Sequence, residues 1–201
     1  MGSSPIGHPN SRFLAALIIV SMSACARAEA NLEYFSVCYG HGCASVASIA
    51  LTTSEWQTIR ELFSETQDAP AEREQLAQAI GAIEKLVGEK TGTASDRGGT
   101  GITSSPGQMD CIDESMNSTT YLTMLARDGL LLWHVIEERA TRGWLILGWP
   151  HTTAVIRERA SGEKFAVDSW FFDNGTPPAI VPLQEWKRGW TPKPQAFNAP
   201  N

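Results

Sequence analysis

Three residues of this chain have the types and the order that cysteine-dependent acyl chemistry requires: Cys111, His151 and Asp168. Cys111 follows a Gly-rich segment and stands at the expected start of a helix, for which Asp110 is a suitable N-cap. The free N–H groups of a first helical turn stabilise a thiolate, which is a common way to activate a catalytic cysteine. Asp113 and the neighbouring carboxylates oppose this effect, so the segment alone does not establish a reactive thiol.

His151 and Asp168 lie on neighbouring β-like runs, 151–158 and 164–171, which a Gly-containing turn joins as a hairpin. A nucleophile at a helix start, a base and a residue that orients the base together form a site for acyl transfer. Because side chains alternate along a strand, the hairpin brings His151 beside Asp168 if the register allows it. We therefore predict a triad of Cys111, His151 and Asp168, although the sequence does not determine the register.

Each member of this predicted triad also has a structural interpretation. Cys111 can be a buried, inert thiol, and Asp168 can be a charge at the end of a strand. His134 is the rival base, although its apolar surroundings in the run 130–138 favour a structural histidine. For the oxyanion of an acyl-transfer intermediate we expect donors from the Cys111 backbone N–H and from Gln108.

Residues 1–30 have the pattern of a secretory signal peptide. Arg12 precedes an apolar run, 13–20, that is too short to span a membrane, and small residues follow as far as Ala30. The sequence that ends at Cys25 also resembles a bacterial lipobox, so Cys25 either carries a lipid anchor or is discarded with the signal. We expect an exported protein that is periplasmic or lipid-anchored at the cell envelope.

The remaining chain, 31–201, is expected to form a single domain, because it is long enough for one hydrophobic core and too short to suggest two. Its composition fits a soluble domain, since 42% of the whole sequence is hydrophobic and 19% is charged. The net charge of −6 and the lack of a basic stripe argue against nucleic acid as a partner. We expect membrane contact only through an N-terminal lipid, and neither a metal nor an organic cofactor.

Cys38 and Cys43 bracket a turn with two glycines between two short β-like runs. In an exported chain this spacing predicts a disulfide across a hairpin. A metal cluster of Cys38, His41 and Cys43 is the alternative, but it supplies only three ligands, at a spacing unlike that of common zinc motifs. With the disulfide formed, Cys111 is left as an unpaired cysteine.

Helices and strands around the triad must position it. A capping box that begins at Ser54 predicts one helix, and a second follows Asp68 and stops before Gly92, with Glu72 and Glu84 on its exposed side.

The loop 91–108 precedes the catalytic cysteine and is expected to form a wall or lid of the cleft. The other predicted elements are β-like runs 34–39 and 44–52, a central helix 111–127, and β-like runs 130–138, 143–149, 151–158 and 164–171. Helices followed by strands favour an α+β fold in which the Cys111 helix packs on an antiparallel sheet.

The segment Met109–Glu114 at a helix start, His151 on a following strand and Asp168 on the next resemble the transglutaminase-like branch of the papain-like superfamily. The closest resemblance is to the bacterial transglutaminase-like cysteine proteinases, and it covers about residues 107–171. It implies a papain-like, transglutaminase-like α+β fold with the central helix on an antiparallel sheet. It also implies that Cys111 is the nucleophile, His151 the general base and Asp168 the group that orients the base.

We therefore expect an exported amide hydrolase or acyl transferase, whose thiolate attacks a peptide or isopeptide-type amide. The expected substrates are a protein, a peptide or a cell-wall peptide. A binding module that is exported or lipid-anchored, and has kept the fold without the chemistry, is the alternative.

Overall fold

The computed structural model describes residues 1–2, 34–100, 106–143 and 150–193. The predicted signal peptide with Cys25, and nearly all of the predicted strand 143–149, lie outside the described residues. Within these ranges no helix has both the length and the apolar character needed to cross a membrane.

The fold is α+β, with a two-stranded and a four-stranded sheet that are both antiparallel. The elements are β1 (Phe35–Tyr39), β2 (Ser45–Ile49), α1 (Thr53–Glu61), α2 (Ala69–Thr91), α3 (Cys111–Arg127), β3 (His134–Arg142), β4 (His151–Glu158), β5 (Lys164–Asp168), β6 (Ala179–Pro182) and α4 (Leu183–Lys187).

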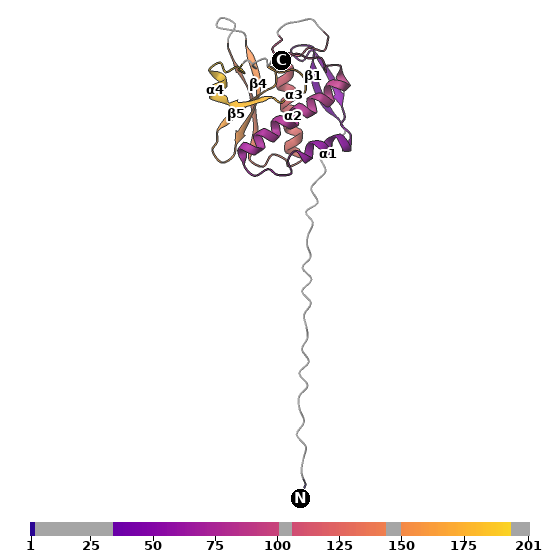
Figure 1. The fold of residues 1–201 in the computed structure, drawn as a ribbon, viewed down its shortest axis with the longest axis vertical. Helices are drawn as coiled ribbons and strands as arrows, with labels where there is room; N and C mark the ends of the chain where they lie inside the picture. The colour runs from indigo at the N-terminus through magenta and orange to yellow at the C-terminus, as the bar shows by residue number, and fades with distance from the viewer. Residues whose placement is uncertain (3–33, 101–105, 144–149, 194–201) are drawn as a thin grey trace, which may run out of the picture.

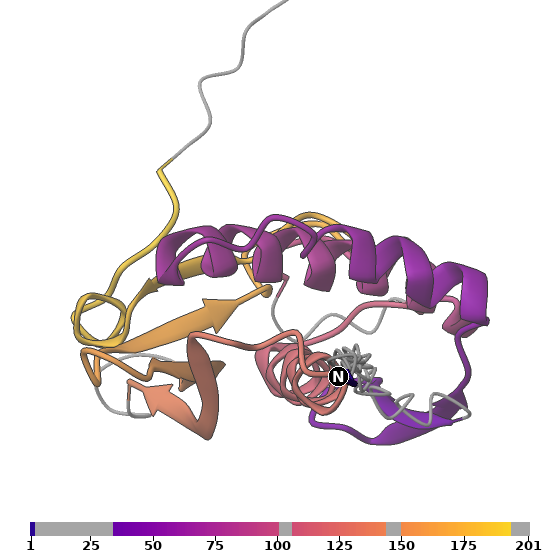
Figure 2. The same ribbon diagram turned by 90° about the horizontal axis from the view of Figure 1, so that it is seen from below.

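The helix that carries Cys111, α3, occupies the middle of the molecule (Figure 1). Figure 2 shows α3 end-on, with the sheet of order β3-β4-β5-β6 on one side, the hairpin β1–β2 on the other and α2 running across both. Since α3 contacts β4 and β1, its N-terminus is held from two sides.

One large hydrophobic core joins these layers, and a smaller cluster of Val155, Ala166, Leu183 and Trp186 lies on the other face of the sheet, against α4. The large core fills the space between α2, α3 and the sheet with side chains that alternate along the strands and recur at helical spacing along the helices. Its fully buried members include Leu76, Ile80, Ile83, Leu122, Leu125, Ala154 and Ile156.

The helices begin where local capping chemistry places them. Helix α2 begins after Asp68, whose carboxylate accepts from the Ala71 N–H, and ends at Gly92 in the left-handed conformation, as predicted. The predicted cap of α1 is wrong by two residues: Thr52, not Ser54, forms the capping box, and it does so with Glu55.

The structure contradicts the predicted exposure of two α2 carboxylates. Glu72 is fully buried and accepts from the backbone N–H groups of Leu132, Trp133 and His134, so it fixes the chain ahead of β3. Glu84 is also buried. Helix α2 buries more of its circumference than its apolar stripe because it lies across both sheets.

Three strands differ from their predicted ranges, and two elements were not predicted. Strand β2 ends at Ile49 instead of continuing to 52. Strand β3 begins at His134 and not at residue 130, because the N–H groups of Leu132 and Trp133 donate to the Glu72 carboxylate and not to a neighbouring strand. Strand β5 ends at Asp168 instead of continuing to 171. The short β6 and α4 cover the open edge of β5, and they bring a tryptophan to the candidate site.

Candidate active site

The structure brings Cys111, His151 and Asp168 to one end of the four-stranded sheet. Cys111 is the first residue of α3, His151 the first of β4 and Asp168 the last of β5. Cys111 is partly exposed, and it lines a cleft of about 700 Å³ together with His151. Asp168 lies behind His151, with its side chain only 1% exposed.

The register between β4 and β5 determines that the side chains of His151 and Asp168 lie next to each other. Ala154 pairs with Val167, so the next residues outward, Thr153 and Asp168, face each other across the strands. The Thr153 hydroxyl donates to the Val167 carbonyl at 2.7 Å, which holds this end of the pair together. His151 lies two residues beyond Thr153 on the same face, and its Nε2 reaches Asp168 Oδ2 at 2.7 Å.

Trp186 is a site residue that sequence reasoning missed. It belongs to α4, is fully buried, and its indole N–H donates to Asp168 Oδ2 at 2.6 Å. The same oxygen therefore accepts from both Trp186 and His151, so its position is fixed from two directions. The spacing of Leu183 and Trp186 after Pro182 was the available signal, because it is typical of a short amphipathic helix.

The surroundings of His151 favour its protonated form. Burial lowers the pKa of His151, but hydrogen bonds and charges from Asp168 and Cys111 outweigh burial and raise that pKa to about 8. Rings of Trp170, Phe171 and Trp186 surround the imidazole, with centroids 4.7, 5.3 and 5.5 Å away. Because Nε2 is bonded to Asp168, Nδ1 is the ring nitrogen left for the thiol.

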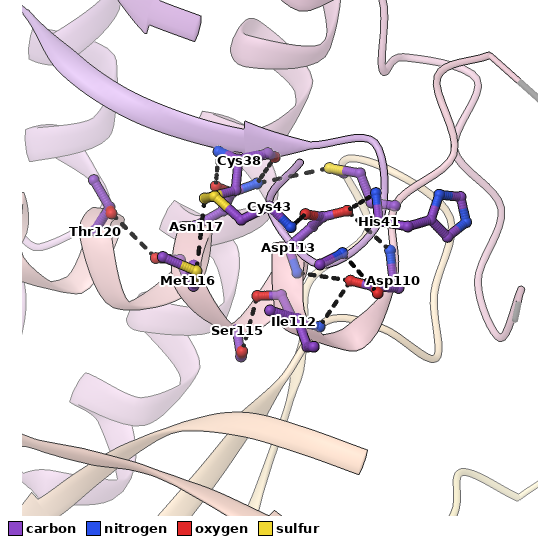
Figure 3. The surroundings of a disulfide bond; sticks show 12 residues. Cys38, His41, Cys43, Asp110, Ile112, Asp113, Ser115, Met116, Asn117 and Thr120 are labelled. Atoms are coloured by element: carbon purple, nitrogen blue, oxygen red, sulfur yellow. Dashed lines mark hydrogen bonds between the residues drawn. A yellow bond between two sulfur atoms is a disulfide. The ribbon is translucent and has the colours of Figure 1, made fainter. Parts of the chain in front are cut away.

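Backbone N–H groups donate to two of the carboxylates beside Cys111. Asp110 accepts from the N–H groups of Ile112 and Asp113 at 3.0 Å each, and from Gly42 at 2.9 Å. Asp113 accepts from the N–H groups of His41 at 2.8 Å and Cys43 at 2.6 Å. The β1–β2 turn thus lies against the N-terminus of α3 with its N–H groups toward both carboxylates (Figure 3).

The third nearby carboxylate, Glu114, lies in surroundings that favour its neutral form. Burial, followed by the negative charges of Glu84 and Asp96, raises the pKa of Glu114 well above its ordinary value. Because the pKa of Glu114 is raised, and N–H groups donate to Asp110 and Asp113, the carboxylates around Cys111 oppose a thiolate less than the sequence indicates.

The oxyanion assignment of Gln108 is not supported. Its amide N–H donates to the Ser95 carbonyl at 2.9 Å, while its oxygen accepts from Arg97 N–H at 3.1 Å and from the Thr100 hydroxyl. Gln108 therefore fastens the loop ahead of α3, and among the described residues its amide N–H bonds to Ser95 of that loop and not to a residue lining the cleft. The Cys111 backbone N–H remains, since the Asp110 carboxylate caps the two N–H groups that follow it and not this one.

Part of the loop 91–108 lines the cleft, as predicted. Thr100 and Trp170 are both lining residues, and the Trp170 indole donates to the Thr100 carbonyl at 3.1 Å. The Gly99 N–H in turn donates to the Trp170 carbonyl at 2.7 Å. These two bonds tie the loop to the segment that follows Asp168.

The rival histidine, His134, lies at the opposite end of β3 from the cleft. It pairs in the sheet with Glu158, whereas His151 pairs with Arg142 at the other end. Its Nδ1 contacts Glu72 Oε1 at 2.8 Å and its Nε2 lies 3.2 Å from Arg73 Nη1. His134 is fully buried and has no free ring nitrogen.

Cys38 and Cys43 form a disulfide in the structure, with Cα atoms 4.7 Å apart. The alternative metal cluster with His41 is therefore excluded, because both sulfurs are joined to each other. The residues that the structure describes contain no group of His, Cys, Asp and Glu side chains arranged to hold a metal ion. Cys111 is the free cysteine of this part of the chain.

Comparisons of the chain with models of protein families, with curated proteins and with solved structures gave no match, so the site is interpreted from its own geometry.

Proposed function

We propose that this protein is a cysteine-dependent amide hydrolase or acyl transferase with a transglutaminase-like, papain-like arrangement. In this proposal Cys111 is the nucleophile, His151 the general base and Asp168 the residue that orients His151. The observation that supports it most is the 2.7 Å contact between His151 and Asp168, behind a cleft that Cys111 also lines.

The proposed reaction has two halves. In the first, the thiol proton of Cys111 passes to His151 Nδ1. The sulfur then attacks the amide carbonyl, and a carbon–sulfur bond forms. The tetrahedral intermediate collapses with cleavage of the carbon–nitrogen bond, and the imidazolium gives its proton to the leaving amine. In the second half, His151 takes a proton from water or an amine, which attacks the thioester and releases the Cys111 thiol.

The setting of the triad supports each role. Trp186 and Asp168 hold the imidazole in one orientation through Nε2, which leaves Nδ1 for the thiol. The Cys111 N–H at the start of α3 is the proposed oxyanion donor, in a region where the helix dipole favours negative charge. The Cys38–Cys43 disulfide fits an oxidising compartment and so supports the expectation of export.

The test is selective alkylation of the folded protein with iodoacetamide across a range of pH. We expect Cys111 to label faster than a free cysteine at neutral pH, because His151 stabilises the thiolate. His151→Gln and Asp168→Asn should slow this labelling, and Cys111→Ala should abolish it. His41→Ala removes the other histidine that lines the cleft and is the matched control, with labelling expected to stay near that of the wild type.

A thiol that labels no faster than free cysteine would contradict the enzyme proposal and leave the non-catalytic binding module. Equal effects of His41→Ala and His151→Gln would show that the base is wrongly assigned.

A further inference from the structure

Arg142 brings a permanent positive charge to the candidate active site. It is the last residue of β3 and the direct cross-strand partner of His151, so the two side chains share one face of the sheet. Both line the same cleft as Cys111. The guanidinium carbon lies 4.4 Å from the centre of the Trp186 ring, within the range of a cation–π contact.

Only one nitrogen of this guanidinium is occupied in the described part of the chain. Nη1 donates to the backbone carbonyls of Trp186 and Trp190, the second at 2.8 Å, and so caps the end of α4. Nε and Nη2 have no acceptor among the described residues. These two nitrogens form one edge of the planar fork, and that edge matches the two oxygens of a carboxylate.

The cation is also partly desolvated. Burial lowers the pKa of Arg142, while the negative charge of Asp168 opposes this, and a guanidinium stays charged at any physiological pH. The acidic residue that lines the cleft, Asp110, is already compensated by three N–H groups and is not bonded to Arg142. A partly buried cation with open donors favours an anionic partner from the cleft.

We propose that Arg142 binds a carboxylate of the substrate, so that the site acts on amides flanked by a carboxylate-bearing residue. This inference rests on the proposed function and names its substrate class. The apolar lining residues Ile112, Trp170 and Phe171 then contact the uncharged part of the same substrate. An acidic side chain or a free C-terminal carboxylate would satisfy the same fork.

The experiment compares iodoacetate with iodoacetamide as reagents for Cys111. The two reagents have the same leaving group, but iodoacetate carries a carboxylate where iodoacetamide carries an amide. The rate with iodoacetate is divided by the rate with iodoacetamide, and this ratio is then divided by the same ratio for free cysteine. The resulting ratio reports carboxylate recognition near the sulfur. We expect this ratio to fall about tenfold in Arg142→Met, the change that corresponds to loss of one charged hydrogen bond. Because both reagents react with the same thiol, a general loss of Cys111 reactivity lowers both rates equally and leaves their ratio unchanged. This holds also for a loss that follows from displacement of α4.

Three comparisons make the result decisive. Arg139→Met removes an equal charge from an exposed side chain of the same strand, and it should leave the ratio unchanged. Arg142→Lys keeps the charge without the fork and should give an intermediate ratio. Added salt should lower the wild-type ratio, though less than for a fully exposed charge, because ions reach a cleft that is open to solvent.

Fast labelling by iodoacetamide with a ratio that Arg142→Met does not change would overturn this inference and leave the proposed function standing. A wild-type ratio equal to that of free cysteine would do the same, even if the methionine variant failed to fold. Slow labelling by both reagents would instead overturn the proposed function, and this inference with it.

Peptides that protect Cys111 from iodoacetamide then identify the source of the carboxylate. Three otherwise identical peptides carry an internal Glu with an amidated end, an internal Gln with a free end, or an internal Gln with an amidated end. Stronger protection by the first assigns an acidic side chain, and stronger protection by the second assigns a C-terminus. Equal protection by all three would contradict carboxylate recognition.

Discussion

Replacing Glu84 with glutamine should make the protein more stable above neutral pH. Glu84 is 4% exposed, and its Oε1 has no hydrogen-bond partner among the described residues. Its Oε2 accepts a long bond from the Gly175 N–H, at 3.4 Å. Burial raises the pKa of Glu84 to about 7; hydrogen bonds from Ser169 and Gly175 act against burial, and the negative charge of Asp96 adds to it.

The size of the effect follows from the difference between the folded and unfolded pKa values of Glu84. A rise from 4.5 to about 7, at 1.36 kcal/mol per pKa unit, corresponds to about 3 kcal/mol. The folded state favours the neutral carboxyl, so this contribution is complete below pH 4.5 and is lost as the pH rises to about 7. Glu84→Gln stays neutral at every pH and should retain it.

Urea unfolding at about pH 5 and about pH 8 measures this difference directly. The free energy of unfolding of the wild type should fall between these two pH values. That of Glu84→Gln should fall less, and the difference between the two proteins should be at most about 3 kcal/mol. Glu89→Gln changes an exposed glutamate of the same helix and is the matched control. If wild type and Glu84→Gln showed the same pH dependence, Glu84 would be ionised in the folded protein and the reasoning would be refuted.

Three further predictions concern the candidate site. Asp168→Asn removes the hydrogen bond to a carboxylate and the negative charge that help to raise the His151 pKa to about 8. The imidazole titration followed by NMR should move to lower pH and Cys111 labelling should slow; an unchanged midpoint would contradict the coupling of His151 to Asp168. Trp186→Phe keeps an aromatic ring but removes the donor to Asp168, and should slow labelling about threefold to tenfold without global unfolding, as near-UV circular dichroism would check. Replacing Cys38 and Cys43 with serine should lower the free energy of unfolding by about 2 kcal/mol, the chain-entropy value for so short a loop, and a change in urea midpoint would measure it.

The start of α3 was predictable because its determinants are local. Asp110 lies next to the helix that it caps, and its acceptor geometry needs only the two N–H groups that follow. The order of His151 and Asp168 on two hairpin strands was also readable from alternation and turn residues. Their contact was not, because it depends on Ala154 facing Val167, and a shift of one residue would have separated them.

Residues bound across long sequence separations were the ones that the sequence misplaced. Glu72 and Glu84 looked exposed because a helical pattern locates apolar side chains and does not reveal a carboxylate that accepts from distant backbone. The partners of Glu72 lie about sixty residues further along the chain, in the segment before β3. The partners of Gln108 are closer in sequence, but its bonds to the backbone of Ser95 and Arg97 depend on how the loop folds, which composition does not reveal.

The two buried histidines of the sheet show what distinguishes a base from a structural residue. Both contact a carboxylate, His134 with Glu72 at 2.8 Å and His151 with Asp168 at 2.7 Å. The second ring nitrogen of His134 lies against Arg73, which also bonds Glu158. Neither nitrogen of His134 is therefore left to accept a proton from a substrate. His151 lines the cleft together with Cys111, and the cysteine contributes to the raised pKa of the imidazole, while Asp168 occupies Nε2 and leaves the second nitrogen available. Since general-base catalysis needs one nitrogen held and the other free, the geometry at His151 supports the chemistry and that at His134 does not.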